Sequence, residues 1–211
     1  LDTPEHHIDD QRRVDPDGKP YPPFHDVQMV VDGEAAAALG QLVRQRWHRA
    51  CGELPQDVDQ QRVADPWPAG VQPDFKNISV AISRTLPRYK EHREIREVEK
   101  LYLDSIENAR NSIYLENQYL SSYRIGEAIK KRLGEEKGPE IIMVLPLKTG
   151  GWLEQHTMDV LRGRILRILR EADVHDRLRV YYPQLTANPE VTLMVHAKVM
   201  VIDGCFVRVG S

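Results

Sequence analysis

The feature that most constrains the fold of this chain is the alternation of helical and extended segments from residue 93 onward. The helical segments repeat apolar residues every three or four positions, and the runs between them are short and rich in β-branched residues. A chain that alternates in this way packs helices against a mostly parallel sheet. The expected helices are residues 93–109, 125–133 and 152–172, and the expected strands are residues 112–119, 140–145, 178–182, 192–202 and 206–209.

The last two of these strands are joined by Asp203-Gly204. Asp-Gly between two β-rich runs is a strong signal for a tight hairpin turn. We therefore expect the final pair of strands to be adjacent and antiparallel in the sheet.

The first part of the chain has a different character. Residues 1–24 are polar and rich in Pro, Asp and His, which is typical of loop. Residues 26–31 alternate like a strand, residues 34–51 have the apolar spacing of an amphipathic helix, and residues 78–82 are a short β-rich run. The proline-rich stretch 52–75 between them predicts a linker.

Composition excludes several classes of protein. Hydrophobic residues make up 41% and charged residues 29% of the 211 residues, and the formal charge is −3, so the chain as a whole does not attract nucleic acid or anionic lipid. No apolar run is long enough to cross a bilayer. Cys51 and Cys205 are far apart and have no metal-ligand spacing, so we expect free thiols. The chain starts at Leu1 rather than Met, which leaves its cellular location open between cytoplasm and membrane periphery.

The end of the chain holds a chemical motif, H-x-K-x4-D-x6-G-S, over residues 196–211. On an extended strand His196 and Lys198 share a face about 6.5–7 Å apart, a separation that suits a phosphate held between imidazole and ammonium. Asp203 lies at the turn and is expected to accept backbone N–H bonds there. Ser211 could donate to the phosphate, and Gly210 would allow the backbone to approach it.

This pattern resembles the HKD motif of the phospholipase D superfamily. Residues 113–120 (IYLENQYL) resemble the strand that opens the second half of tandem phospholipases D, and residues 24–47 resemble the segment that closes the first half. The resemblance implies an α/β/α layered fold with a mostly parallel mixed sheet. It also implies a remnant of the first half over residues 1–51, a linker over 52–75 and a truncated second half over 76–211.

The resemblance further implies a mechanism with two histidines, one attacking phosphorus and the other protonating the leaving alcohol. In-line displacement places these two groups on opposite sides of phosphorus, so one imidazole cannot readily do both. His196, in the second half, is expected to be the general acid and then the general base. Lys198 would neutralise the phosphoryl oxygens and Asp203 completes the catalytic motif, with no metal or cofactor expected.

The sequence departs from the family pattern because no other H-x-K occurs before His196. We therefore expect the chain to be a fragment that lacks the N-terminal HKD half, and to be inactive or very weak alone. The alternative is a homodimer in which two copies of His196 face each other.

Several other residues are candidates for a role at the site or for a structural role. The resemblance implies that Asp26 is a candidate to orient a catalytic histidine; the alternative is that it caps the strand. Glu116 and Gln118 share a face of their strand and either bind substrate or form a structural hydrogen-bond network. His6 and His7 with Asp9 and Asp10 are expected to be solvent-exposed rather than a metal site. Trp152 and His156 follow Gly150-Gly151 at the carboxyl edge of the sheet and could line an entrance.

The predicted function is phosphodiester hydrolysis or phosphatidyl transfer on a phospholipid substrate, with peripheral membrane contact and no nucleic-acid partner. A phosphatidyltransferase of the cardiolipin or phosphatidylserine synthase type differs only in the acceptor. A non-catalytic phospholipase D-like binding module is the rival outside the enzymes.

Overall fold

The computed structural model describes residues 17–19, 23–56, 67–151, 153, 155–185 and 192–210. The chain divides into two compact units, one formed by Leu1–Gln28 together with Thr85–Ser211 and the other by Met29–Arg84. Ser211, Trp152 and the His6-His7 pair with Asp9 and Asp10 lie outside the described residues.

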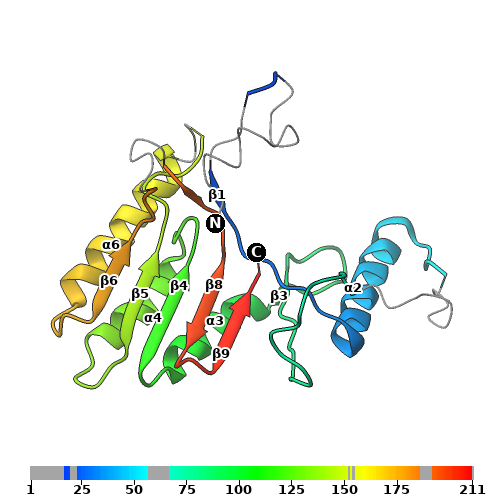
Figure 1. The fold of residues 1–211 in the computed structure, drawn as a ribbon, viewed down its shortest axis with the longest axis horizontal. Helices are drawn as coiled ribbons and strands as arrows, with labels where there is room; N and C mark the ends of the chain where they lie inside the picture. The colour runs from blue at the N-terminus through cyan, green and yellow to red at the C-terminus, as the bar shows by residue number, and fades with distance from the viewer. Residues whose placement is uncertain are drawn as a thin grey trace. The chain divides into compact units, whose positions relative to one another are not determined.

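The larger unit is built around a five-stranded sheet with the strand order β6-β5-β4-β8-β9 (Figure 1). Its strands are β4 (Ser112–Glu116), β5 (Glu140–Val144), β6 (Leu178–Tyr181), β8 (Val199–Ile202) and β9 (Phe206–Val209). β4, β5 and β6 are parallel, whereas β8 is antiparallel to β4 and β9 is antiparallel to β8. The sheet is therefore mixed, with β4 at the point where the direction changes.

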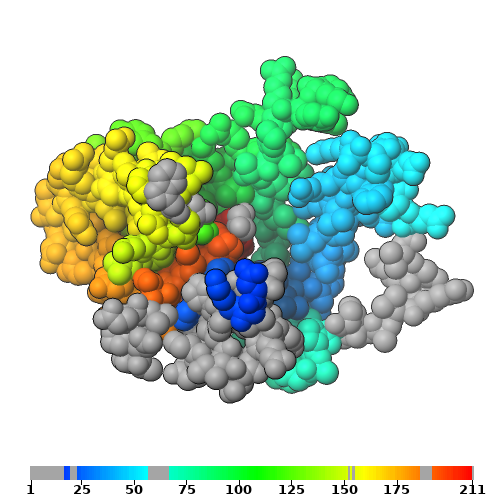
Figure 2. All heavy atoms as spheres, turned by 90° about the horizontal axis from the view of Figure 1, so that it is seen from above, coloured from blue at the N-terminus to red at the C-terminus, as the bar shows by residue number. Residues whose placement is uncertain are grey.

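Three helices cover one face of this sheet: α3 (Glu97–Asn108), α4 (Tyr123–Leu133) and α6 (Val160–Ala172), the last preceded by a π-helical turn η3 (Gln155–Asp159). Alternate strand residues such as Ile113, Ile141 and Met143 point into the core and are at most 1% exposed. They pack against fully buried helix residues, including Ile129 and Leu169. Figure 1 shows α6 beside β6 at one edge of the sheet, and the yellow and orange atoms of this part of the chain lie next to one another in Figure 2.

Two short pairings lie outside the main sheet. β1 (Phe24–His25) is parallel to β7 (Met194–Val195), and β2 (Thr85–Leu86) is antiparallel to β3 (Ile95–Arg96). The first pairing joins positions about 170 residues apart in the sequence, with Phe24 opposite Met194. It brings the segment after residue 23 to the backbone just before His196.

The smaller unit contains α2 (Gly33–Cys51). None of its side chains is fully buried, and the helix ends at Gly52, whose φ of 81° places it in the left-handed region that suits glycine. Within the described residues 67–84 no strand forms, so the predicted strand at 78–82 is wrong. Ile78 and Val80 are 57% and 44% exposed there, without the cross-strand partners that a strand requires.

The predicted α/β class is confirmed, and four details differ from expectation. The sheet has two parallel and two antiparallel pairings instead of being mostly parallel. In the described part of the larger unit the helices occupy one face, whereas an α/β/α arrangement has them on both. Residues 26–31 do not form the expected strand; the strand in this region is β1, which ends at His25. The expected strand 192–202 is divided into β7 and β8. The division follows from a change of partner, since β7 pairs with β1 while β8 pairs with β4.

The predicted hairpin turn is confirmed. Asp203 and Gly204 both have positive φ, 53° and 65°, and the Cys205 N–H donates to the Ile202 carbonyl over 3.1 Å. Two successive residues with positive φ are what a tight I′-type turn between antiparallel strands requires. Cys51 and Cys205 are both free, as expected, and the structure shows that both are exposed.

Candidate functional site

His196 and Lys198 lie on the extended connection between β7 and β8. Val195 and Ala197 are fully buried and Val199 is 7% exposed, so the alternation turns His196 and Lys198 to the opposite, more open side. The N–H groups of His196 and Ala197 both donate to the carbonyl of His25, over 2.8 and 3.1 Å. The two motif side chains thus share a face, and the backbone that carries them is fixed by β1.

The side chain of Asp26 contacts His196 directly. Asp26 Oδ2 lies 2.9 Å from His196 Nδ1, and Asp26 Oδ1 accepts the Val27 N–H over 3.0 Å. Because an ionised carboxylate only accepts hydrogen bonds, this contact places a proton on Nδ1 of His196. The Phe24 ring, 5.1 Å away between centroids, packs beside the imidazole.

The charges of this group of residues depend on one another. Partial burial raises the pKa of Asp26, but the hydrogen bond from His196, the Val27 N–H and the charges of His196 and Lys198 outweigh burial and leave the pKa below its usual value. Burial lowers the pKa of Lys198, and the attraction of Asp26 offsets part of this effect. One carboxylate, that of Asp26, therefore interacts electrostatically with both an imidazole and an ammonium group.

Glu116, at the end of β4, has both carboxylate oxygens occupied by protein groups. Oε2 lies 2.7 Å from His25 Nε2, and Oε1 accepts the Tyr114 hydroxyl over 2.5 Å. Burial, and then the hydrogen bond to Glu116 and its charge, raise the pKa of Tyr114. Of the two readings of Glu116, this geometry favours the hydrogen-bond network. Gln118, also expected on this face, is 7% exposed.

Asp203 lies at the other end of β8, at the hairpin turn. Its Oδ1 accepts the N–H groups of Asn111 and Ser112 over 2.7 and 2.8 Å, and its Oδ2 accepts the Arg110 N–H over 2.9 Å. These three bonds lower the pKa of Asp203. Asp203 thus holds the backbone at the start of β4, which confirms the expected backbone contacts. It is separated from His196 by the length of β8.

Gly210 lies beside the backbone of Lys198, because its N–H donates to the Lys198 carbonyl over 3.2 Å. Arg208 from β9 reaches the same carbonyl over 3.3 Å and also contacts Gly210 O, while its guanidinium lies over the Tyr102 ring. Arg208 carries no local signal in the sequence, since only the β8–β9 register shows that this arginine meets the backbone of the motif lysine.

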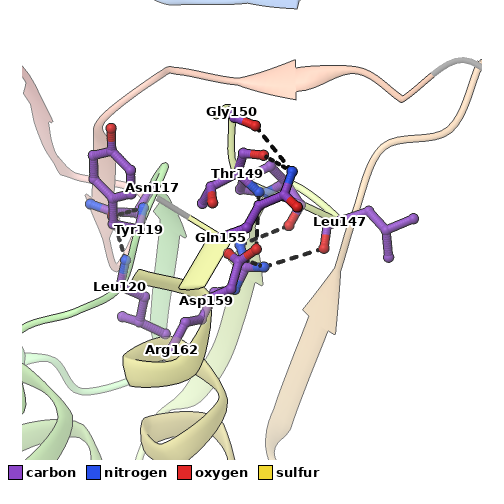
Figure 3. A network of polar contacts seen from close by, with 10 residues as sticks. Asn117, Tyr119, Leu120, Leu147, Thr149, Gly150, Gln155, Asp159 and Arg162 are labelled. Carbon is purple, nitrogen blue, oxygen red and sulfur yellow. Dashed lines mark hydrogen bonds and ion pairs between the residues drawn. The ribbon is translucent and has the colours of Figure 1, made fainter. Parts of the chain in front are cut away.

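The loop after β5 is held by a separate polar network, drawn in Figure 3. Arg162 donates to the carbonyls of Pro146 and Leu147 and pairs with Asp159, and Gln155 donates to the carbonyls of Thr149 and Gly150. On the neighbouring turn, Asn117 Oδ1 accepts two backbone N–H groups, from Tyr119 and Leu120. His156 is exposed in η3, and its place at an entrance stays a prediction.

The described residues include no cluster of three or more His, Cys, Asp or Glu side chains that could hold a metal ion. Across the same part of the chain, no helix combines the length and the apolar character needed to span a membrane.

The larger unit belongs to the class of α/β layered domains, and it presents a histidine, a lysine and a carboxylate in one place. Comparison with known families agrees with this class: the family described as "Cardiolipin synthase, PLD-like domain" matches residues 102–211, more than half of the chain. The chain therefore belongs to the phospholipase D superfamily, whose members act on phosphodiesters. A search of curated proteins found no match.

Proposed function

We propose that this chain carries the second-half site of a phospholipase D-type enzyme that cleaves the phosphodiester of a phospholipid head group. The observation that carries the proposal is the contact between His196 Nδ1 and Asp26 Oδ2, on the same face as Lys198. An imidazole whose Nδ1 is held by a carboxylate has its Nε2 on the side of the ring away from that carboxylate. That is the arrangement a general acid–base group requires.

In the proposed reaction, a second histidine attacks phosphorus while the bond between phosphorus and the head-group oxygen breaks. His196 Nε2 gives its proton to the departing alcohol, and the Asp26 carboxylate stabilises the histidine while it is charged. Water or an alcohol then attacks the phosphohistidine, and His196 takes back a proton from it. Lys198 offsets the negative charge of the non-bridging oxygens throughout.

The second histidine must come from outside this H-x-K motif, which occurs once in the 211 residues. We propose that an N-terminal HKD half supplies it, and we expect the 211-residue chain alone to turn over very slowly. Robust turnover by a dimer of the isolated chain would favour the alternative of two facing copies of His196.

Transfer to an alcohol is the second candidate, and the name of the matching family, which includes cardiolipin synthase, favours it. Hydrolysis and transfer share every step up to the phosphohistidine and differ only in the acceptor. Lipid is favoured over nucleic acid by the resemblance of residues 24–47 and 113–120 to the tandem lipid enzymes.

Phosphatidylglycerol vesicles distinguish these functions with one substrate. The natural protein that contains this chain is incubated with them, and the lipid products are separated. Hydrolysis gives phosphatidic acid and glycerol, whereas transfer to a second phosphatidylglycerol gives cardiolipin and glycerol. His196→Ala should abolish both products, and His175→Ala, which alters an exposed histidine between α6 and β6, should leave them unchanged. Binding of vesicles without any product would support the non-catalytic module instead.

A further inference from the structure

His25 makes two separate contacts in the larger unit. Its backbone carbonyl accepts the N–H groups of both His196 and Ala197, and its side chain lies 2.7 Å from Glu116. The residue after it, Asp26, contacts the His196 imidazole. One short segment therefore touches the backbone and the side chain of His196, and the side chain of His25 attaches this segment to β4.

Glu116 is itself held firmly. Its side chain is 12% exposed, its backbone pairs with Val144 of β5 and Val199 of β8, and its second carboxylate oxygen accepts the Tyr114 hydroxyl. A carboxylate with both oxygens bonded and its backbone inside a sheet offers a fixed point. β1, by contrast, is only two residues long and pairs with the equally short β7. A two-residue pairing by itself holds a segment weakly.

We infer that His25, Glu116 and Tyr114 form a positioning relay that fixes Asp26 against the imidazole of His196. This inference rests on the proposed function, because it assigns the relay to the same site. The side chain of His25 touches neither substrate nor reacting atoms in this account; it acts through Asp26. The consequence is that loss of the His25–Glu116 contact should misalign His196 without removing any group that meets the phosphate.

The first test compares His25→Leu with His25→Gln in the natural protein that contains this chain. Glutamine can place an amide nitrogen near the position of Nε2 and keep the contact with Glu116, whereas leucine cannot. With phosphatidylglycerol vesicles, His25→Leu should lower kcat about 10–100-fold with KM within about twofold of wild type, a loss of the size that a small misalignment causes. His25→Gln should recover most of the loss. His92→Leu, which alters an exposed histidine 3.7 Å from Glu91, is the matched control.

A double-mutant cycle separates positioning from general weakening of the fold. If His25 acts through Asp26, then in an Asp26→Asn background His25→Leu should lower kcat by less than about threefold. A full and independent loss in that background would overturn the inference. Tyr114→Phe keeps the buried ring and removes only the hydroxyl that fixes Glu116. It should lower kcat in the same direction but less, and it serves where His25→Leu does not fold.

Proton NMR gives a readout that does not need turnover. A proton on His196 Nδ1 that is shared with Asp26 resonates far downfield, and it is assigned by its loss in His196→Gln. We expect this signal in wild type and His25→Gln, and its loss or upfield shift in His25→Leu. An unchanged signal in folded His25→Leu would overturn the relay. A signal that changes as expected in a protein with no activity on phosphodiesters would support the relay and contradict the proposed function.

Discussion

His196 Nδ1 and Asp26 Oδ2 are 2.9 Å apart although 170 positions separate the two residues in the sequence. The parallel pairing of Phe24–His25 with Met194–Val195 brings them together, because each strand delivers its next residue to the same end of the pair. The contact is about one-third open to solvent, with side-chain exposures of 36% for His196 and 31% for Asp26. A phosphate could therefore reach the imidazole while the carboxylate holds its far nitrogen.

Asp26→Asn should lower kcat by about 10²–10⁴-fold, because an amide can donate to Nδ1 and stabilise the wrong tautomer of His196. KM should change little, since Asp26 faces the imidazole rather than the lipid. Steady-state kinetics on phosphatidylglycerol vesicles measure both constants in the natural protein. A fall in kcat of less than about threefold would show that the carboxylate does not orient the catalytic histidine.

Lys198→Met should weaken inhibition by orthovanadate, which imitates the five-coordinate phosphorus of the transition state. Methionine fills a similar volume and lacks the charge, so the inhibition constant should rise at least about tenfold. Lys137→Met, which removes an exposed charge in the loop before β5, is the matched control and should have no effect. Equal inhibition of wild type and Lys198→Met would remove Lys198 from the phosphate site.

Asp203→Asn should destabilise the larger unit by about 1–2 kcal/mol near pH 7, allowing for solvent screening at an exposed turn. The three N–H bonds to the carboxylate lower its pKa in the folded state. Their stabilisation is therefore fully present above the unfolded pKa of about 3.9, and it is lost as the pH falls through the lower folded value.

Urea unfolding of wild type and Asp203→Asn at about pH 7 and about pH 2.5 tests this sign. The difference between the two proteins should shrink at the lower pH. Asp176→Asn is a suitable control, since Asp176 has the same φ of 53° and pairs only with Arg179 among the bonds described for it. A difference that grew on acidification would contradict the account.

Met143→Ala should cost about 2–5 kcal/mol of stability, because Met143 is fully buried between the sheet and its helices. Ile142→Ala, one position earlier on β5, should cost much less, since that side chain is on the opposite face and 39% exposed. Urea unfolding of both variants compares the two faces of one strand. Similar costs would mean that both faces are covered in the natural protein.

Much of the larger unit could be predicted from the sequence because its signals are local. The apolar spacing in residues 125–133 and 160–172 and the Asp203-Gly204 turn each depend on neighbours a few positions away. The antiparallel pairing of β8 with β4 could not be predicted. Strand order and direction depend on contacts between segments that are distant in the sequence. The prediction of a strand at 78–82 is wrong for the same reason, because a short β-rich run does not by itself provide a partner strand.

The site was predictable in its chemistry and less so in its geometry. The spacing of His196 and Lys198 gives a shared face wherever the backbone is extended. Asp26 was a candidate only by resemblance, and no local signal could show that it would meet His196. The partner of Glu116 was equally hidden, because the His25–Glu116 contact spans 91 positions.

The most direct test of the central claim is the dependence of the His196→Ala defect on the leaving group. A general acid matters most when the departing alcohol is a poor leaving group, and little when it is a stable phenolate. If His196 protonates the leaving group, His196→Ala should lose at least about 10³-fold in kcat/KM on phosphatidylglycerol. It should lose far less in the first, phenol-releasing step on a phosphatidyl ester of p-nitrophenol. Equal losses on the two substrates would contradict the role of general acid, and no loss on either would place the reaction outside this site.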